Sequence, residues 1–367
     1  KATMDIKPGE QAGGSIVVIH NQAARRIRAN LSYDNFGGSA TGEDQAALSV
    51  SLDNPLGLND FINVTHRRST ESDFGSMHSR SNSFMYSVPA GYLTLTASHS
   101  WSDYLTTIRL PGGNLISNGY STNTALAAEY VAYRDQMSRF AITSTLTGKD
   151  SDNYLAGQYL GVSSRKLASF DLGAAWNTAL LGGVLGVNLN HVWGLTSFGA
   201  LEDADNLPEY APHAQFRKWT ASLNWMRPFQ IGEQNLSFNS NLSGQAGVDV
   251  LYGSEQFSIG SLYSVRGFRN SSIAGDTGFF WRNDLAMPIP TQLAGLPVTI
   301  RPYAGFDMGT ISSRYDEVGG QLTGGVLGVS VSSSYFGIDI SGVKPLSMPD
   351  WLKDEGFQFF VKANLSY

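Results

Sequence analysis

Apolar and polar residues alternate along many segments of this chain. The clearest is the last segment, 357–367, in which the odd positions are apolar and the even positions are polar, except for Phe360. The same alternation recurs around Leu95, Leu189 and Ile300. Successive side chains of a β-strand point to opposite faces, so each segment predicts a strand with one apolar and one polar face.

The length of these segments and their aromatic ends favour a transmembrane barrel over a soluble sandwich. Most of them exceed the ~5–6 residues of a typical soluble strand and fit the ~9–11 residues that a tilted membrane-spanning strand needs. Tyrosine and tryptophan lie near the segment ends, as expected for side chains at the two membrane interfaces. These aromatic residues are Tyr33, Trp101, Tyr133, Trp193, Trp225 and Trp281.

Sixteen such segments can be counted, and short turns alternate with longer loops between them. The expected strand centres are Leu31, Leu48, Val64, Ser83, Leu95, Ala127, Thr143, Leu172, Leu189, Ser222, Phe238, Asp284, Ile300, Val329, Ile338 and Val361. The longer loops are expected at Asp103–Asn118, Asp150–Val162, Gly199–Pro212 and Asp249–Thr277. This alternation is typical of short periplasmic turns and long extracellular loops. We therefore predict an all-β fold, a 16-stranded antiparallel transmembrane β-barrel in the bacterial cell outer membrane.

The composition agrees with a barrel and excludes several other classes of protein. Only 15% of the residues are charged, yet the mean hydropathy is −0.15, and 40 of the 367 residues are glycine. An aromatic content of 11% argues against a disordered chain. The longest nearly apolar stretch, Thr178–Val187, is too short for a membrane-spanning helix. The net charge of −6 and the lack of a basic run argue against nucleic-acid binding.

No sequence pattern for catalysis, metal binding or cofactor binding is found. The chain has no cysteine, which removes disulfides, thiolate metal sites and cysteine nucleophiles. It has neither a G-x-S-x-G elbow nor a phosphate-binding loop, and its six histidines lack metal-ligand spacing. The acidic residues Glu202, Asp203 and Asp205 fit a solvated outer loop better than a cation site. We therefore predict a protein that is not an enzyme and holds no metal ion or cofactor.

The sixth of the expected outer loops, Asp249–Thr277, carries the most informative motif. It contains Val265, Arg266, Gly267 and Phe268 in succession, and it is too long to be a simple connector. This motif resembles the barrel superfamily that includes the barrel-assembly insertase and the two-partner secretion transporters (TpsB). Further motifs resemble TpsB barrels in the same order across nearly the whole chain. Their residues are Asp34, Asn35 and Gly37 after the first strand, Asn54, Pro55 and Gly57 in the first turn, and Gly305 and Gly309 on the thirteenth strand.

The resemblance implies that the sixth loop folds back into the barrel lumen, where its arginine pairs with an aspartate on the inner wall. Alternation gives an independent indication, because the even positions of 298–306 are apolar and Asp307 therefore belongs to the lumen-facing set. An arginine–carboxylate pair can be bidentate, which suits a latch that fixes a loop. Asp284, whose parity also points inward, is the alternative partner of Arg266. Gly267 permits a tight backbone beside the arginine.

By the same resemblance, the chain is expected to act in two-partner (type Vb) secretion. It would export a large TpsA-type exoprotein, such as an adhesin, a haemolysin or a contact-dependent inhibition toxin. The alternatives are an outer-membrane protein insertase of the same superfamily and a passive porin. Residues 1–22 resemble the end of a second POTRA domain with its linker, and residues 23–367 are expected to form the barrel. The plug helix, the first POTRA domain and most of the second are not found in this sequence.

Other expected partners are outer-membrane lipid, lipopolysaccharide and the barrel-assembly machinery, which would read the aromatic C-terminal strand ending at Tyr367. The barrel is expected to be a monomer and to bind no nucleic acid. Lumen-facing neutral residues, Asn188 and Asn190 among them, offer weak and exchangeable hydrogen bonds to a passing polypeptide. We therefore expect lysines introduced at these two positions to slow export.

Overall fold

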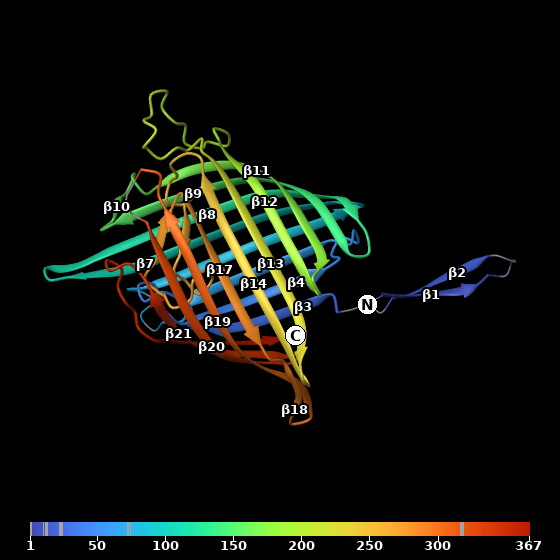
Figure 1. The fold of residues 1–367 in the computed structure, drawn as a ribbon. Coiled ribbons are helices and arrows are strands. Elements are labelled where there is room, and N and C mark those ends of the chain that lie inside the picture. The colour runs from blue at the N-terminus through green and yellow to red at the C-terminus, as the bar shows by residue number, and fades with distance from the viewer. Residues whose placement is uncertain are drawn as a thin grey trace.

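The barrel predicted from the alternation is present in the structure, a computed structural model. It describes residues 2–9, 11, 14–21, 25–71, 73, 75–315 and 319–367. These residues form a closed antiparallel barrel of sixteen strands, together with two small hairpins (Figure 1). Each of the sixteen expected strand centres lies within a strand of the barrel. The predicted fold class is therefore confirmed.

The barrel strands follow one another in sequence around the wall, and β22 closes the barrel by pairing with β3. The first eight are β3 (Ile27–Asp34), β4 (Gln45–Asp53), β5 (Phe61–Ser69), β6 (His78–Ala90), β7 (Leu93–Leu110), β8 (Gly113–Arg134), β9 (Ser138–Leu155) and β11 (Arg165–Leu180). The other eight are β12 (Gly183–Leu195), β13 (Arg217–Ile231), β14 (Gln234–Gly247), β17 (Thr277–Ala286), β19 (Leu296–Ser312), β20 (Gly320–Ser332), β21 (Phe336–Ser347) and β22 (Gln358–Ser366). Two short strands, β10 (Gln158–Tyr159) and β18 (Ile289–Leu293), pair with β9 and β19.

On most barrel strands the exposed apolar side chains lie on one face, as a membrane-spanning barrel requires. On β19, Ile300 and Phe306 are exposed at even positions, whereas Asp307 at an odd position is completely buried. On β17, Trp281 is exposed at an odd position, and Asp284 has the opposite parity. Both aspartates therefore belong to the face of the wall that points away from lipid.

The first short turn, between β4 and β5, contains residues whose backbone conformation ends β4. Asn54 and Gly57 have positive φ angles of 54° and 79°, a conformation that Asn and Gly adopt at low cost. The buried Asp60 carboxylate accepts hydrogen bonds from the backbone N–H groups of Leu56 and Leu58. The motif residues Asn54, Pro55 and Gly57 thus lie in a tight turn. Its shape is fixed by positive φ angles and by hydrogen bonds to the Asp60 carboxylate.

Two of the expected long loops are instead largely β-structure. β7 and β8 remain paired as far as Leu110 and Gly113, so the expected loop 103–118 is two strand ends joined by a two-residue turn. The expected loop 150–162 contains the end of β9, which continues to Leu155 and pairs with β10. These two expectations were wrong because a hairpin that extends into water on both faces needs no apolar alternation.

Residues before the barrel form a separate hairpin. β1 (Ala2–Pro8) and β2 (Ser15–Asn21) pair with each other in antiparallel register, and β2 includes the strand expected at 16–19. Figure 1 shows this hairpin extending away from the barrel. In the described part of the chain, no helix is long and apolar enough to cross a membrane.

Candidate functional site

The segment between β14 and β17, residues 248–276, is named loop 6, and Arg266 is its most enclosed cation. The Arg266 guanidinium donates two hydrogen bonds to Asp307, from Nε to Oδ2 and from Nη2 to Oδ1, both at 2.6 Å. Its backbone N–H also donates to Asp307 Oδ2, at 3.0 Å. Nη2 lies 2.8 Å from Asp284 Oδ1 as well. The structure therefore brings Arg266 together with both aspartates that the sequence offered as partners.

Burial and charge act in opposite directions on this cation. Arg266 is 6% exposed and Asp307 is 0% exposed. Burial alone would lower the pKa of the Arg266 guanidinium, but Asp307 and Asp284 outweigh it and raise the pKa above its usual value. The bidentate geometry matches the planar fork of arginine, which a lysine could not reproduce. Arg266 is therefore held as a cation by two carboxylates from neighbouring strands.

Glycines on the wall give loop 6 room to approach. A Cβ at Gly305 would lie 2.3 Å from Asp284 Oδ1, and one at Gly309 would lie 3.0 Å from Val265 Cγ2. Gly267 has a φ of +115°, and a Cβ there would lie 2.7 Å from the backbone nitrogen of Pro345. The motif glycines 267, 305 and 309 therefore all lie where a larger residue would clash or be strained.

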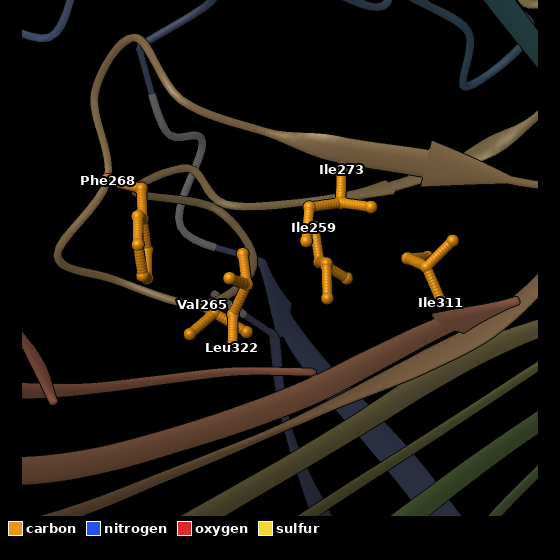
Figure 2. Packing of buried hydrophobic residues seen from close by; sticks show 6 residues of the cluster. All are labelled: Ile259, Val265, Phe268, Ile273, Ile311 and Leu322. Carbon is orange, nitrogen blue, oxygen red and sulfur yellow. The ribbon is translucent and has the colours of Figure 1, made fainter. Parts of the chain in front are cut away.

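Val265 and Phe268, on either side of the Arg266–Gly267 pair, are completely buried. They belong to one apolar cluster with Ile259, Ile273, Ile311 and Leu322. Figure 2 shows that the first four of these six come from loop 6 and that Ile311 and Leu322 come from the wall strands β19 and β20. The tip of loop 6 is thus held by an ion pair between two apolar contacts.

Gly324 on β20 allows a test of how closely loop 6 must approach the wall. A Cβ at Gly324 would lie 1.6 Å from the Arg266 carbonyl oxygen, whereas ordinary contact begins at 3.4 Å. We expect Gly324→Ala to displace the Arg266 backbone by more than an ångström and to make loop 6 sensitive to trypsin in the folded barrel. Cleavage after Arg266 or Arg269, measured by mass spectrometry, gives the readout.

The neighbouring glycine provides the matched control. Gly325 has the opposite parity, and a Cβ there would meet only Leu346, at 3.4 Å. Gly325→Ala should therefore leave loop 6 as protected as in the wild type. Equal protection in the Gly324 and Gly325 variants would show that the close approach of loop 6 is not needed.

The residues after Phe268 are bound by the two loops that flank the closing strands. The Glu355 carboxylate, between β21 and β22, accepts hydrogen bonds from the backbone N–H groups of Arg269, Asn270 and Ser271. Burial would raise the pKa of Glu355, but these N–H groups outweigh burial and lower it. The Arg269 guanidinium forms an ion pair with Glu43, between β3 and β4. Loop 6 therefore contacts the loops on both sides of the β22–β3 junction, at the end where β22 begins and β3 ends.

The motif at the end of β3 supports that junction. Asp34 is buried and forms an ion pair with Arg67 on β5, at 2.6 Å. The Asn35 amide donates to the carbonyl oxygen of Phe359 and accepts from the N–H of Val361, so it pairs with β22 as a backbone amide would. A Cβ at Gly37 would lie 1.9 Å from the carbonyl oxygen of Gly42, in the loop after β3. These three residues do not contact Arg266; they fix the edge at which the barrel closes.

Sequence reasoning did not identify Glu355, Arg269 or Glu255 as residues that hold loop 6. The partners of Glu255 could have indicated it. Lys149 and Lys218 occupy lumen-facing positions of their strands in a chain of low charge, so an acidic partner for them could be expected. Loop residues have no such periodicity, so their partners are set only by the tertiary structure. Within the described ranges, no group of three or more His, Asp or Glu side chains is arranged to hold a metal ion.

Comparison with known proteins gives one family across most of the chain. Residues 13–331 match the family described as haemolysin secretion/activation protein ShlB/FhaC/HecB. The chain is 33% identical over 375 residues to the outer membrane transporter CdiB of Dickeya dadantii, covering 100% of this chain and 65% of that protein. It is 30% identical to the hemolysin transporter protein ShlB of Serratia marcescens, covering 88% of this chain and 57% of that protein.

A solved structure agrees with these relatives. CdiB from Escherichia coli superposes with a TM-score of 0.93 at 31% identity, covering 100% of this chain and 67% of that chain. The chain spans less than two thirds of the length of the two curated relatives, so it corresponds to only part of each of them.

Proposed function

Because the chain belongs to the ShlB/FhaC/HecB family and forms an outer-membrane β-barrel, we propose that it is the barrel of a two-partner secretion transporter. It exports a large TpsA-type exoprotein, an adhesin, a haemolysin or a contact-dependent inhibition toxin, through its lumen. The observation that carries this proposal is the buried Arg266, which Asp307 and Asp284 fix against the lipid-remote face of the wall. In this proposal the activity is transport of a polypeptide, with no catalysed reaction and no cofactor.

In this proposal, loop 6 occupies the lumen and closes it at rest. Arg266 with Asp307 and Asp284 forms a latch, and Val265, Gly267 and Phe268 place the arginine. The support is geometric: Arg266 contacts Asp284 on β17 and Asp307 on β19, Val265 and Phe268 pack with Ile311 on β19 and Leu322 on β20, and Gly267 lies against Pro345 on β21. The apolar cluster holds loop 6 against the wall by contacts that a passing polypeptide can displace. The ion pair fixes the tip of loop 6 in one position.

The remaining parts of the proposal concern assembly and partners. Residues 1–22 are the end of a POTRA domain and its linker, and residues 23–367 are the barrel. The hairpin of β1 and β2 supports this division, since it pairs with no strand of the barrel in the described residues. The protein is inserted as a monomer by the barrel-assembly machinery and lies among outer-membrane lipid and lipopolysaccharide.

The inner wall offers neutral polar groups to an exported chain. Asn188 and Asn190 on β12 have the parity opposite to exposed Leu189, and their amides donate to Ser222 and Thr220 on β13. We expect the double variant Asn188→Lys and Asn190→Lys to slow export several-fold, because two cations would bind acidic stretches of the passing chain. Pulse-chase release of the exoprotein measures the rate, and Asn188→Gln with Asn190→Gln is the neutral control. An unchanged rate in the lysine variant would contradict passage along this wall.

Export in cells tests the function itself and separates it from insertion of outer-membrane proteins. Cells that lack the full-length transporter should retain the exoprotein encoded beside it, while the levels of other outer-membrane proteins stay normal. A general loss of outer-membrane proteins instead would favour the insertase function, and continued release of the exoprotein would reject the proposal.

A further inference from the structure

Loop 6 makes a second set of ion pairs before Arg266 in the sequence, in which Glu255 and Lys218 are buried and Lys149 is 35% exposed. The Glu255 carboxylate lies 2.6 Å from the Lys149 ammonium on β9 and 2.9 Å from the Lys218 ammonium on β13. Glu255 is 4% exposed and Lys218 is 8% exposed. Lys149 and Lys218 have the parity opposite to the exposed residues Ile142 and Trp219 on their own strands, so both belong to the inner wall.

The backbone at Glu255 is held in the same place as its carboxylate. Its carbonyl oxygen accepts hydrogen bonds from the Lys218 ammonium at 2.8 Å and from the Gln245 side-chain amide at 3.0 Å. The Lys218 ammonium also lies 5.3 Å from the centre of the Phe216 ring. A surface ion pair would be worth little, but this cluster combines burial, two cations and two backbone contacts.

Apolar packing supports the same part of loop 6. Leu251 is 1% exposed and forms a buried cluster with Val192 on β12 and Phe216. Its backbone N–H donates to the buried Asp276 carboxylate, at 2.9 Å. The first limb of loop 6, residues 248–256, therefore has its own contacts with the wall, separate from those of the tip.

The two sets of charges lie on different parts of the wall. Going round the barrel, the order is β9, β11, β12, β13, β14, β17 and β19. Lys149 and Lys218 hold Glu255 at β9 and β13, whereas Asp284 and Asp307 hold Arg266 at β17 and β19. The charges are also reversed, because the loop supplies the anion at one site and the cation at the other.

We propose that Glu255 is a positioning residue that anchors the first limb of loop 6 independently of the Arg266 latch. This inference rests on the proposed function, in which loop 6 closes the lumen. When the latch opens, the tip of the loop moves while the limb at 248–256 stays on β9 and β13. Export then requires displacement of residues 257–276 rather than of the whole of loop 6.

The charge state of the anchor at neutral pH follows from its surroundings. Burial would raise the pKa of Glu255, but Lys218 and Lys149 outweigh it and lower the pKa. Glu255 is therefore a carboxylate, and neutralising it leaves the buried Lys218 and the partly exposed Lys149 without their shared anion. Removing one member of a buried charge cluster is strongly destabilising for the contact it makes.

Spin labels on the full-length protein in lipid vesicles test whether the two anchors act separately. This chain has no cysteine, so an introduced one gives a single label site in it. Ser254→Cys reports on the first limb and Tyr263→Cys on the tip, and both native side chains are exposed. Glu255→Gln should mobilise the label at 254 and leave that at 263 unchanged, and Arg266→Ala should do the reverse. Glu202→Gln, an exposed acid outside loop 6, should change neither spectrum.

Two results would overturn the inference. The first is a label at 254 whose mobility does not respond to Glu255→Gln. The second is an Arg266→Ala variant in which both labels are mobilised equally, since loop 6 would then have one anchor. Heat-modifiable migration in gels verifies that every variant contains a folded barrel. The spectra need no exoprotein, so failure of the anchor and failure of the export function are observed separately.

Discussion

Export of the exoprotein is expected to fall to near background when Arg266 is replaced by alanine in the full-length protein, while the barrel still assembles. The substitution leaves Asp307 and Asp284 close together without their shared cation. Removing one partner of a buried ion pair costs about 3–5 kcal/mol. Since 1.4 kcal/mol is tenfold, the latched state loses a factor of more than ~10² in population. Export falls because loop 6 then has no single position from which an arriving exoprotein can displace it. Exoprotein released per cell measures export, and heat-modifiable migration measures assembly.

The other variants at this site separate charge from geometry. Asp307→Ala should reproduce the loss, because it removes three of the hydrogen bonds that Arg266 makes. Arg266→Lys should restore export only in part, since an ammonium cannot make the bidentate contact. Arg109→Ala, on the exposed end of the β7–β8 hairpin, is the control and should export normally. Normal export from both Arg266→Ala and Asp307→Ala would contradict the latch.

The barrel could be predicted because alternation is a local property of each strand. A side chain at an odd position of β19 faces inward wherever the strand lies in the barrel, so the parity of Asp307 followed from its neighbours alone. The same reasoning failed at the end of β7, where water on both faces removes the apolar signal although the backbone ladder continues to Leu110. Alternation therefore locates the part of a strand that faces lipid and not the whole strand.

The contacts of loop 6 needed the tertiary structure. Glu255 meets Lys149, which is 106 positions away in the sequence, and no periodicity relates a loop residue to a strand. The sequence offered Asp307 as the partner of Arg266 and Asp284 as the alternative, and alternation did not exclude either, because both have inward parity on adjacent strands. The structure shows that one guanidinium reaches both, since Asp284 is opposite Gly305 in the ladder and that glycine leaves space for Arg266.

Deleting residues 257–275 is expected to convert a barrel of low, erratic conductance into one with a steady and several-fold larger single-channel conductance. The deletion removes the paired short strands β15 (Phe257–Ile259) and β16 (Ile273–Gly275), Arg266 and the loop 6 members of the apolar cluster. Deleting residues 204–208, in the exposed connection between β12 and β13, is the control and should leave the conductance low.

This experiment also separates a secretion barrel from a passive porin. A porin needs an open path at rest, so its conductance should already be high and steady in the wild type and change little on deletion of loop 6. In the proposed transporter, the buried contacts of Arg266 and Phe268 keep the path closed until an exported chain displaces them. A large wild-type conductance that the deletion does not raise would therefore reject the closing role of loop 6 while leaving the barrel fold intact.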